Sequence, residues 1–596
     1  MKILLIGINA KYIQTNLAIR VLKAYAEQYS ACVQSGKVQI ELAEFNINQP
    51  AEFILRKIYE TDAQMLLFST YIWNRELIMH IVSDIRKLLP EAIIGLGGPE
   101  VSWSAEQILN TNSAVNLIFS GEGEQSLTEA IDRFEYRSTG HGTHAPINLT
   151  DIPGVYIRGT GLPGTGESIS AGGSRPVIQN LDCIPFPYRI DNLDFDPKHR
   201  IVYYESSRGC PFSCAYCLSS LDKEVRYYSL DRVLSEIQFF LDNEFPLIKF
   251  VDRTFNLRPE RYLTIWKYIR DHHNGKTLFH FEIAGEYLPD EAFAVLDTMP
   301  EGAIQLEIGI QSIHPETLQI VGRPAHPEKL AENIRRIPRI IHTHVDLIAG
   351  LPAENFTDFG KSFNFAFALE PGMLQTGFLK ILNGTTMERL AQETPGFVWS
   401  SFPPYEVFAS SEISCRDLFR IKDVEHLVDT WYNTDLMRNT LNRLAGDIYE
   451  GEAFQLFLNL ADHTKQFYQD GDLFLPRRPD DYFSCLAAFL SALKKNLVNK
   501  TQNIEYLLEY LKYDYLLQGK PGHFPTWFIR RYSREAHDTA LNSQGLLSDP
   551  FVPRRTAYAR SEFERFRFTP NDTETAILFI YPEKNFKGKR TRIILL

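Results

Sequence analysis

Three of the chain's seven cysteines lie close together in the stretch 206–218, which reads SSRGCPFSCAYCL. They are Cys210, Cys214 and Cys217, separated by intervals of four and three positions. Three neighbouring thiolates can ligate three irons of a [4Fe–4S] cluster, because soft sulfur ligands suit iron–sulfur chemistry. The fourth iron then has no protein ligand and is open to a substrate or a cofactor. The spacing therefore predicts an iron–sulfur site with one open iron.

Two other interpretations of this motif stay open, a structural zinc site and a group of inert buried thiols. Structural zinc sites usually pair their ligands, with a second C-x-x-C or a pair of histidines elsewhere. His199 lies upstream, but the sequence has no second C-x-x-C. In a chain of 596 residues, seven cysteines do not make a disulfide framework.

The C-x3-C-x-Φ-C form, with the aromatic Tyr216 before the last cysteine, resembles the signature of the radical S-adenosylmethionine superfamily. In that family the open iron chelates the amino and carboxylate groups of S-adenosylmethionine. Electron transfer then cleaves the sulfonium to methionine and a 5′-deoxyadenosyl radical. The resemblance implies a [4Fe–4S] cluster, S-adenosylmethionine, and an electron donor such as flavodoxin or ferredoxin.

Charge and hydropathy limit the class of protein further. The net charge of −12 argues against sequence-independent nucleic-acid binding, which favours a basic surface. No stretch reaches the roughly 18 consecutive apolar residues of a membrane span. The apolar run 3–8 is too short for a signal peptide and predicts a strand. We therefore expect a cytoplasmic protein with neither a membrane nor a nucleic-acid partner.

Residues 1–135 alternate short apolar runs with amphipathic stretches, which predicts a doubly wound, Rossmann-like parallel sheet. The expected strands are 2–8, 38–45, 64–69, 92–96 and 114–119, and the expected helices are 17–29, 50–60, 76–89, 105–109 and 121–134. Ligands of such sheets bind beyond the carboxyl ends of the strands, where this chain has glycine-rich loops. None of the loops is a phosphate loop or a G-x-G-x-x-G turn, so a flavodoxin-like domain without a ligand is the alternative.

Standing before the cysteine motif, this domain resembles the cobalamin-binding domain of cobalamin-dependent radical S-adenosylmethionine enzymes. Cobalamin domains that ligate cobalt through histidine use D-x-H-x-x-G, whereas NAKYIQ stands at 9–14 here. The enzyme family that this domain resembles also lacks that histidine. The resemblance implies that Trp73 shields the lower face of the corrin, although a surface or packing role is the alternative. The other implied cobalamin contacts are Ser69, Thr70, Gly97, Gly98, Pro99, Glu100, Gly121, Glu122 and Gly123.

Residues 136–198 are rich in Gly, Ser, Thr and Pro and form a predicted linker, with a small hairpin expected between 155–157 and 177–178. Strand–helix alternation then resumes over residues 199–393. Strands are expected at 201–206, 246–252, 278–284, 303–310, 342–349 and 377–382, with helices at 231–245, 259–272, 290–297, 328–337 and 357–369. This pattern predicts a partial (β/α)6 TIM-like barrel, with function at the carboxyl ends of the strands.

Polar residues in these apolar strands need partners when buried, and one interpretation pairs Asp252, Arg253, Glu282 and Glu307 across the barrel. The family resemblance implies a different role. It places 252–256, including Asp252 and Arg253, where the methionine amino group of S-adenosylmethionine binds. It also gives cofactor contacts to Glu307 and Gln311 and puts Ile348 beside the adenine. Four histidines of this domain are interpreted as structural or solvated, namely His280, His314, His342 and His344.

From residue 394 to 596 the alternation stops and helices dominate, at 417–436, 437–447, 451–470, 480–497 and 503–518, before two strands at 574–581 and 589–595. This part resembles a helical domain of unassigned role in one subgroup of the family. The leading functional hypothesis is C-methylation of an unactivated carbon through methylcobalamin, on a small-molecule or peptide substrate. The alternatives are oxidative cyclisation or rearrangement with the same cofactors, a methylthiotransferase-like RNA modification enzyme, and a non-catalytic cobalamin sensor.

Overall fold

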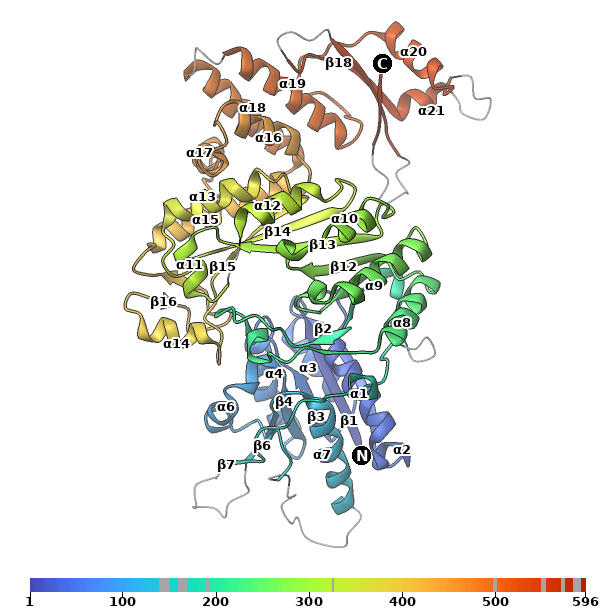
Figure 1. The fold of residues 1–596 in the computed structure, drawn as a ribbon, viewed down its shortest axis with the longest axis vertical. Coiled ribbons are helices and arrows are strands. Elements are labelled where there is room, and N and C mark those ends of the chain that lie inside the picture. The colour runs from blue at the N-terminus through green and yellow to red at the C-terminus, as the bar shows by residue number, and fades with distance from the viewer. Residues whose placement is uncertain are drawn as a thin grey trace.

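The computed structural model describes residues 1–138, 149, 151–158, 169–188, 193, 195–323, 326–496, 501–547, 554–569, 574–582 and 591–596. Figure 1 shows an elongated molecule, with an N-terminal α/β unit at the bottom, a central α/β unit, and a helical unit that ends in a small sheet at the top. No described helix combines the length and apolar character needed to cross a membrane.

The N-terminal unit is a doubly wound sheet, as predicted. Its first five strands are parallel in the order β2-β1-β3-β4-β5. Alternate residues of β1 enter two separate cores, Leu4 and Ile6 on one face and Ile3 and Leu5 on the other. Covering both faces explains why β1, β3, β4 and β5 are mostly apolar, whereas the edge strand β2 alternates polar and apolar residues. The strands are β1 (Lys2–Asn9), β2 (Gln39–Asn46), β3 (Met65–Ser69), β4 (Ile93–Gly97) and β5 (Leu117–Phe119).

Helices cover the two faces of this sheet. One core contains residues of α3, α4, α5 and α6, and the other contains residues of α1 and α7. The helices are α1 (Leu17–Tyr29), α2 (Ala31–Gln34), α3 (Ala51–Tyr59), α4 (Arg75–Leu88), α5 (Pro99–Ser102), α6 (Ala105–Thr111) and α7 (Gly123–Ser138).

The segment expected to be a linker extends the N-terminal sheet. β6 (Val155–Arg158) pairs antiparallel with β5, and β7 (Ile169–Ala171) pairs with β6. The predicted hairpin between 155–157 and 177–178 is therefore wrong in its second strand. Ile178 instead lies in the core of the central unit, and its N–H donates to Glu122 at 2.7 Å. Residues 139–148 and 159–168 of the segment lie outside the described part of the chain.

The central unit contains the predicted six parallel strands, in the order β15-β14-β13-β12-β11-β8. They are β8 (Ile201–Tyr204), β11 (Leu247–Phe250), β12 (Leu278–Ile283), β13 (Ile304–Gln311), β14 (His342–Ala349) and β15 (Met373–Phe378). β15 begins earlier than the predicted 377, because Met373 and Leu374 already pair with β14. A two-residue ladder of β9 (Ser207–Arg208) and β10 (Arg226–Tyr227) flanks the segment that carries Cys210, Cys214 and Cys217, here called the cysteine loop.

Helices follow most of these strands, as a β/α barrel requires. They are α8 (Leu230–Asp242), α9 (Pro259–His272), α10 (Asp290–Leu296), α11 (Pro315–Ile320), α12 (Pro327–Arg336) and α13 (Phe356–Phe367). α14 (Thr386–Glu393) and the two-stranded ladder of β16 (Val398–Trp399) and β17 (Val407–Ala409) close the unit.

The C-terminal unit shares one hydrophobic core with the barrel, because Phe454 of α17 packs on Phe359 and Phe363 of α13. Its helices are α15 (Cys415–Leu427), which continues as a π-turn, α16 (Arg438–Asp447), α17 (Ala453–Phe467), α18 (Pro479–Asn496) and α19 (Thr501–Leu517). Two shorter helices, α20 (Arg534–Ser543) and α21 (Arg554–Ala559), precede an antiparallel sheet. That sheet joins β18 (Ser561–Phe566), which was not predicted, with β19 (Thr575–Ile580) and β20 (Arg592–Leu595).

Candidate active site

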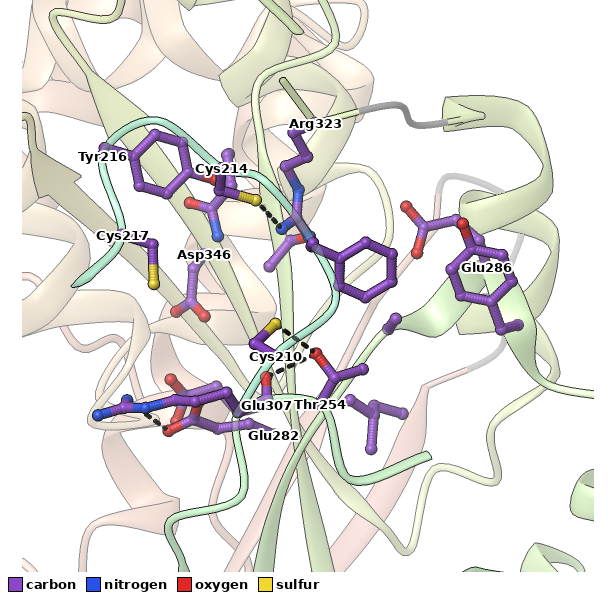
Figure 2. Close-up of a pocket in the computed structure, with 17 residues that line it drawn as sticks. Cys210, Cys214, Tyr216, Cys217, Thr254, Glu282, Glu286, Glu307, Arg323 and Asp346 are labelled. Carbon is purple, nitrogen blue, oxygen red and sulfur yellow. Dashed lines mark hydrogen bonds and ion pairs between the residues drawn. The ribbon is translucent and has the colours of Figure 1, made fainter. Parts of the chain in front are cut away.

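The cysteine loop lies over the carboxyl end of the barrel strands, and its three thiols border one cavity (Figure 2). All three cysteines are free; Cys210 and Cys214 are buried and Cys217 is partly buried. The loop starts at Gly209, whose φ is +91° and where a Cβ atom would meet the carbonyl oxygen of Glu224 at 2.2 Å. Only glycine fits this turn, which starts the loop that brings the three sulfurs to the cavity.

The opposite wall of the cavity comes from the barrel strands and the segments that follow them. Thr254, after β11, contacts the sulfur of Cys210 at 3.7 Å. Arg323, after α11, lies 3.8 Å from the sulfur of Cys214 and donates to the carbonyl of Gly309 at 2.6 Å. The cavity is also lined by Phe212, Tyr216, Arg253, Glu282, Ile283, Ala284, Glu286, Tyr287, Glu307, Gln311 and Asp346.

Several buried polar atoms at this cavity have no partner among the described residues. They are Nε of Arg323, Oε1 of Gln311, Oδ1 of Asp346 and the hydroxyl of Tyr216. Buried polar groups are normally hydrogen-bonded, so a set of orphans around one cavity indicates a polar ligand. A guanidinium suits a carboxylate, and carboxyl groups suit an ammonium, a sulfonium or ribose hydroxyls. These side chains therefore fit S-adenosylmethionine bound beside a cluster.

Carboxyl groups outnumber guanidinium groups in the lining, four to two. Burial raises the pKa of Glu282 to about 7 and that of Asp346 to about 8. Burial is the largest influence on Glu307 and acts to raise its pKa, but the hydrogen bond with His280 at 2.9 Å and the nearby charges of His280, Lys249 and His344 together hold that pKa below its ordinary value. Such a surplus of carboxyl groups favours a cationic ligand.

The structure brings some of the predicted barrel residues to the cavity and turns others away. Arg253, Glu307 and Gln311 line it, whereas Ile348 packs on the hydrophobic core and does not. Pairing across the barrel, the other interpretation, holds for Arg253 and Glu282, which form an ion pair at 3.9 Å.

Asp252 is not among the residues that line the cavity, and its expected contact with the cofactor stays a prediction. It is 2% exposed and accepts hydrogen bonds from the N–H of Ser206 at 2.9 Å and from the hydroxyls of Ser206 at 2.6 Å and Ser207 at 2.5 Å. Asp252 therefore anchors the start of the cysteine loop to the end of β11.

Several polar residues of the cavity were not predicted as site residues, among them Arg323, Asp346, Glu286 and Tyr216. Asp346 carried the same signal as Glu307, a carboxyl group within an apolar strand. The sequence around Arg323 did not indicate a site residue, because this side chain reaches the cysteines only through the turn at Gly322, whose φ is +65°.

The predicted cobalamin residues gather at the carboxyl edge of the N-terminal sheet, where β3 and β4 end side by side with Ser69 paired to Gly97. Gly98 has a φ of +109°, and a Cβ atom there would lie 2.5 Å from the carbonyl oxygen of Thr70. The buried hydroxyl of Thr70 has no partner among the described residues. Gly98 therefore serves the close approach of two chain segments, and the orphan hydroxyl of Thr70 is the feature that fits a ligand at this edge.

Trp73 lies on the loop after β3, where the sequence placed it. Its ring stacks on Tyr71 with centroids 4.4 Å apart, its Nε1 donates to the carbonyl of Ile8 at 3.1 Å, and it is 44% exposed. The exposed flat ring, held from behind, is available to a planar ligand. Pro99 begins α5 immediately after the Gly98 turn.

Two predicted cobalamin contacts join the units of the molecule instead of standing free. The carboxylate of Glu100 pairs with Arg75 at 2.8 Å and accepts a hydrogen bond from Tyr405, which follows the barrel. Glu122 pairs with Arg226 at 2.8 Å and with Arg208 at 3.3 Å. These contacts fix the glycine loops of the sheet relative to the cysteine loop.

Gly121 and Gly123 stand on either side of Glu122 but differ in their surroundings. Gly121 has a φ of +81° and open space where a Cβ atom would point, whereas a Cβ atom at Gly123 would meet Leu22 at 3.1 Å. Gly121 can therefore face a ligand, and Gly123 serves close packing of α7 on α1.

Three domain families match the chain in succession. Residues 3–131 match the B12 binding domain, residues 204–366 match the radical SAM superfamily, and residues 393–575 match a protein of unknown function, DUF4080. The radical SAM match favours a [4Fe–4S] cluster at the three cysteines over zinc or inert thiols.

Curated relatives match about half to three fifths of the chain. An uncharacterized methyltransferase of Pyrococcus horikoshii is 27% identical over 49% of this chain and 61% of its own length. The cobalamin-dependent radical SAM methyltransferase TokK of Streptomyces tokunonensis is 23% identical over 60% of this chain and 52% of its own. The chain thus spans between half and two thirds of the length of these relatives.

Solved structures show the same fold at low sequence identity. The radical enzyme OxsB, with aqua-cobalamin and S-adenosylmethionine bound, has a TM-score of 0.58 at 14% identity, over 93% of this chain and 81% of its own. The methyltransferase TsrM of Kitasatospora setae, with cobalamin and a [4Fe–4S] cluster bound, has a TM-score of 0.54 at 15% identity, over 78% and 99%.

A B12 binding domain followed by a radical SAM domain defines this chain as a member of the cobalamin-dependent radical S-adenosylmethionine enzymes. Within that class it carries the DUF4080 domain behind the barrel, in agreement with the predicted subgroup that has a helical C-terminal part. Enzymes of this class require a reductant and a substrate.

Proposed function

We propose that this chain is a cobalamin-dependent radical S-adenosylmethionine C-methyltransferase. The observation that carries the proposal is the single cavity bordered by three free thiols, a surplus of carboxyl groups and the partly unpartnered Arg323. The names of the methyltransferase relatives support methyl transfer as the outcome. When bound, the cofactors supply a 5′-deoxyadenosyl radical and a transferable methyl group.

The residues of the chain divide the work of binding. Cys210, Cys214 and Cys217 hold the cluster, and Arg323 receives the carboxylate of S-adenosylmethionine next to Cys214. Asp346 and Gln311, whose orphan oxygens border the same cavity, accept hydrogen bonds from its amino or ribose groups.

The rings of Phe212 and Tyr287 lie nearly parallel, with centroids 6.2 Å apart, and supply an apolar part of the cavity wall. An apolar wall excludes water from the place where a radical forms.

At the N-terminal sheet, we assign cobalamin binding to the loops of Ser69, Thr70, Gly97 and Gly98, and a position against the corrin to Trp73. Ion pairs between the N-terminal unit and the central unit support a fixed distance between the two cofactors. Besides Glu122, Glu124 pairs with Arg208 of β9, just before the cysteine loop, at 2.6 Å, with side chains 6% and 13% exposed. Such a buried charged contact keeps its geometry.

The proposal extends to partners and location. We propose a cytoplasmic enzyme that acts on a small molecule or a peptide and takes electrons from a flavodoxin or a ferredoxin. The acidic net charge of −12 supports a partner other than nucleic acid.

The test is an anaerobic reconstitution with iron, sulfide and hydroxocobalamin, followed by S-adenosylmethionine and a strong reductant. Mass spectrometry quantifies 5′-deoxyadenosine and S-adenosylhomocysteine. We expect both products, with 5′-deoxyadenosine lost in Cys214→Ala and S-adenosylhomocysteine lost without cobalamin. Cys415→Ala, which changes a free cysteine of α15, is the matched control. 5′-Deoxyadenosine alone would support oxidative cyclisation or rearrangement, and the absence of both from cluster-loaded protein would overturn the proposal.

A further inference from the structure

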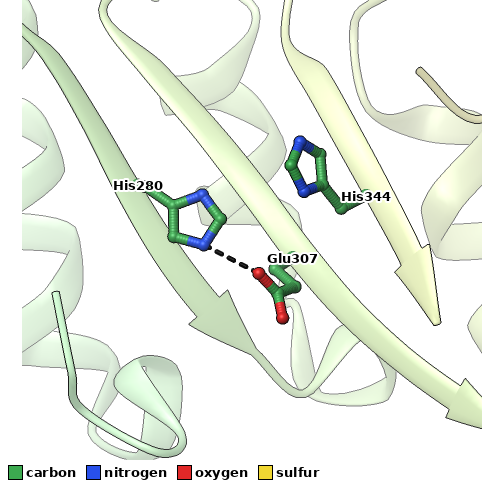
Figure 3. Close-up of side chains that lie close together, drawn as sticks. All are labelled: His280, Glu307 and His344. Atoms are coloured by element: carbon green, nitrogen blue, oxygen red, sulfur yellow. Dashed lines mark hydrogen bonds and ion pairs between the residues drawn. The ribbon is translucent and has the colours of Figure 1, made fainter. Parts of the chain in front are cut away.

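Two histidines and a carboxylate from three neighbouring strands converge inside the barrel (Figure 3). They are His280 of β12, Glu307 of β13 and His344 of β14. The parallel register places Glu307 directly beside His344, and Gln305 beside His280. One ligand atom from each of the three residues lies within 4.8 Å of the other two. The barrel topology therefore builds this group from residues far apart in sequence.

The two histidines differ in their contacts, and only His280 has the fully partnered surroundings of a structural histidine, the role expected of both from the sequence. His280 is 2% exposed, with Nε2 2.9 Å from Glu307 and Nδ1 2.6 Å from the side-chain amide of Gln305. His344 is half-buried and lies ring to ring with His280, with centroids 5.5 Å apart. No hydrogen bond to either ring nitrogen of His344 is found within the described ranges. One imidazole is thus held in place and the other has free nitrogens.

We propose that His280, Glu307 and His344 bind a divalent first-row transition-metal ion, separate from the iron–sulfur cluster. Two imidazoles and one carboxylate form a donor set that suits Zn²⁺ or Fe²⁺ and leaves coordination positions open. Coordination through Nε2 of His280 would place the imidazole proton on Nδ1, where the side-chain oxygen of Gln305, turned by an amide flip, can accept it. Gln305 serves as the outer partner that fixes the ring of His280.

The geometry requires only a small adjustment. Ligand atoms about 2.0–2.2 Å from one ion lie about 3–3.5 Å from each other. The His280–Glu307 pair is already at 2.9 Å, so the ring of His344 is the part that moves inward. The surplus of carboxyl groups at the adjoining cavity favours a dication there.

Glu307 lines the cavity as well as belonging to the metal group. An ion held there would turn its open positions toward the cavity, within reach of an oxygen or nitrogen ligand on a substrate. Because a carboxylate has two oxygens, one can bind the ion while the other faces the cavity.

The test uses the full-length, cluster-loaded chain, in which the cysteines are already occupied. Calorimetric titration with Zn²⁺ measures stoichiometry and affinity, and anaerobic titration with Co²⁺ adds a visible difference spectrum that reports the ligands. We expect one ion per chain, an affinity at least about 100-fold lower in His344→Gln, and a loss of about 10–100-fold in Gln305→Leu. His272→Gln changes a histidine on the outer helix α9 and should leave binding unaltered.

Thermal stabilisation by the metal ion gives a second measurement, which does not depend on enzyme activity. Zn²⁺ should raise the melting temperature of the parent chain and of His272→Gln, and have no such effect on His344→Gln, provided that the variant unfolds cooperatively. The proposal is overturned if the cluster-loaded chain binds no ion stoichiometrically, or if His344→Gln and His280→Gln bind as tightly as the parent. Neither result depends on methyl transfer.

Discussion

Replacing Asp252 by alanine separates the two roles that this residue can have. In the structure its carboxylate is buried and accepts three hydrogen bonds, from the N–H and hydroxyl of Ser206 and from the hydroxyl of Ser207. A hydrogen bond to a charged group contributes about 1.5–3 kcal/mol. The two hydroxyls can turn to other acceptors, but the backbone N–H of Ser206 cannot, and it stays buried without a partner.

The expected local destabilisation in Asp252→Ala is therefore about 3 kcal/mol, less than the sum of three such bonds. Hydrogen exchange measures it directly, because 1.4 kcal/mol corresponds to a tenfold change in the opening equilibrium. Peptides covering β8 and the start of the cysteine loop should exchange about 100-fold faster, and those from β1 should be unchanged. Asp252→Asn keeps one acceptor oxygen for Ser206 and should show a smaller effect.

Iron content and S-adenosylmethionine binding complete the comparison. The loosened loop should hold less iron per chain, and S-adenosylmethionine binding should fall only in proportion to the iron lost. Unchanged exchange and full iron content, together with abolished S-adenosylmethionine binding, would refute the structural role and restore the cofactor contact expected from the sequence.

Three further predictions concern stability. Gly98→Ala should cost at least about 2 kcal/mol and reduce cobalamin retention on gel filtration, because φ is +109° and the new Cβ would lie 2.5 Å from the carbonyl oxygen of Thr70; retained cobalamin and an unshifted melting temperature would contradict it. Lys512→Met should cost about 3 kcal/mol in urea unfolding, because the buried Glu564 loses the ammonium now at 3.0 Å and keeps only the N–H of Arg531 at 2.6 Å and the guanidinium of Arg530 at 4.0 Å. A second change of Glu564 to leucine should recover part of the loss, and equal stability of the single and double variants would oppose this reasoning. Burial raises the pKa of Glu354 from 4.5 to about 7. The contribution of the protonated carboxyl group to the unfolding free energy, about 3 kcal/mol, is therefore present below about pH 4.5 and lost as the pH rises through about 7. Glu354→Gln should flatten the pH dependence of the unfolding free energy in that window, and an identical slope in both proteins would rule the effect out.

The order of strands and helices within each of the two α/β units was predictable, because hydrophobic periodicity is a local property of the sequence. β1 is apolar at nearly every position, since both of its faces are covered, and the carboxyl edge follows from parallel topology. Cys210, Cys214 and Cys217 were predicted from spacing alone, and all three border the cavity.

The remaining features depend on contacts between distant segments. Asp252 follows β11 with its carboxylate turned toward Ser206, and local sequence does not indicate that orientation. Glu122 faces Arg226, a contact across units that neither segment indicates by itself. The pairing of β6 with β7 was missed because both strands are short and separated by glycine-rich chain. The approach of His280 to His344 needs the strand order of the barrel.

Electron paramagnetic resonance of the reduced cluster, with and without S-adenosylmethionine, tests cofactor binding at the cavity most directly. The wild-type protein should show a cluster signal that changes when S-adenosylmethionine is added. Arg323→Met should keep its iron and the signal but lose the change, and Cys214→Ala should show no cluster signal. A full S-adenosylmethionine-induced change in Arg323→Met, or an intact cluster signal in Cys214→Ala, would contradict the assignment of this cavity.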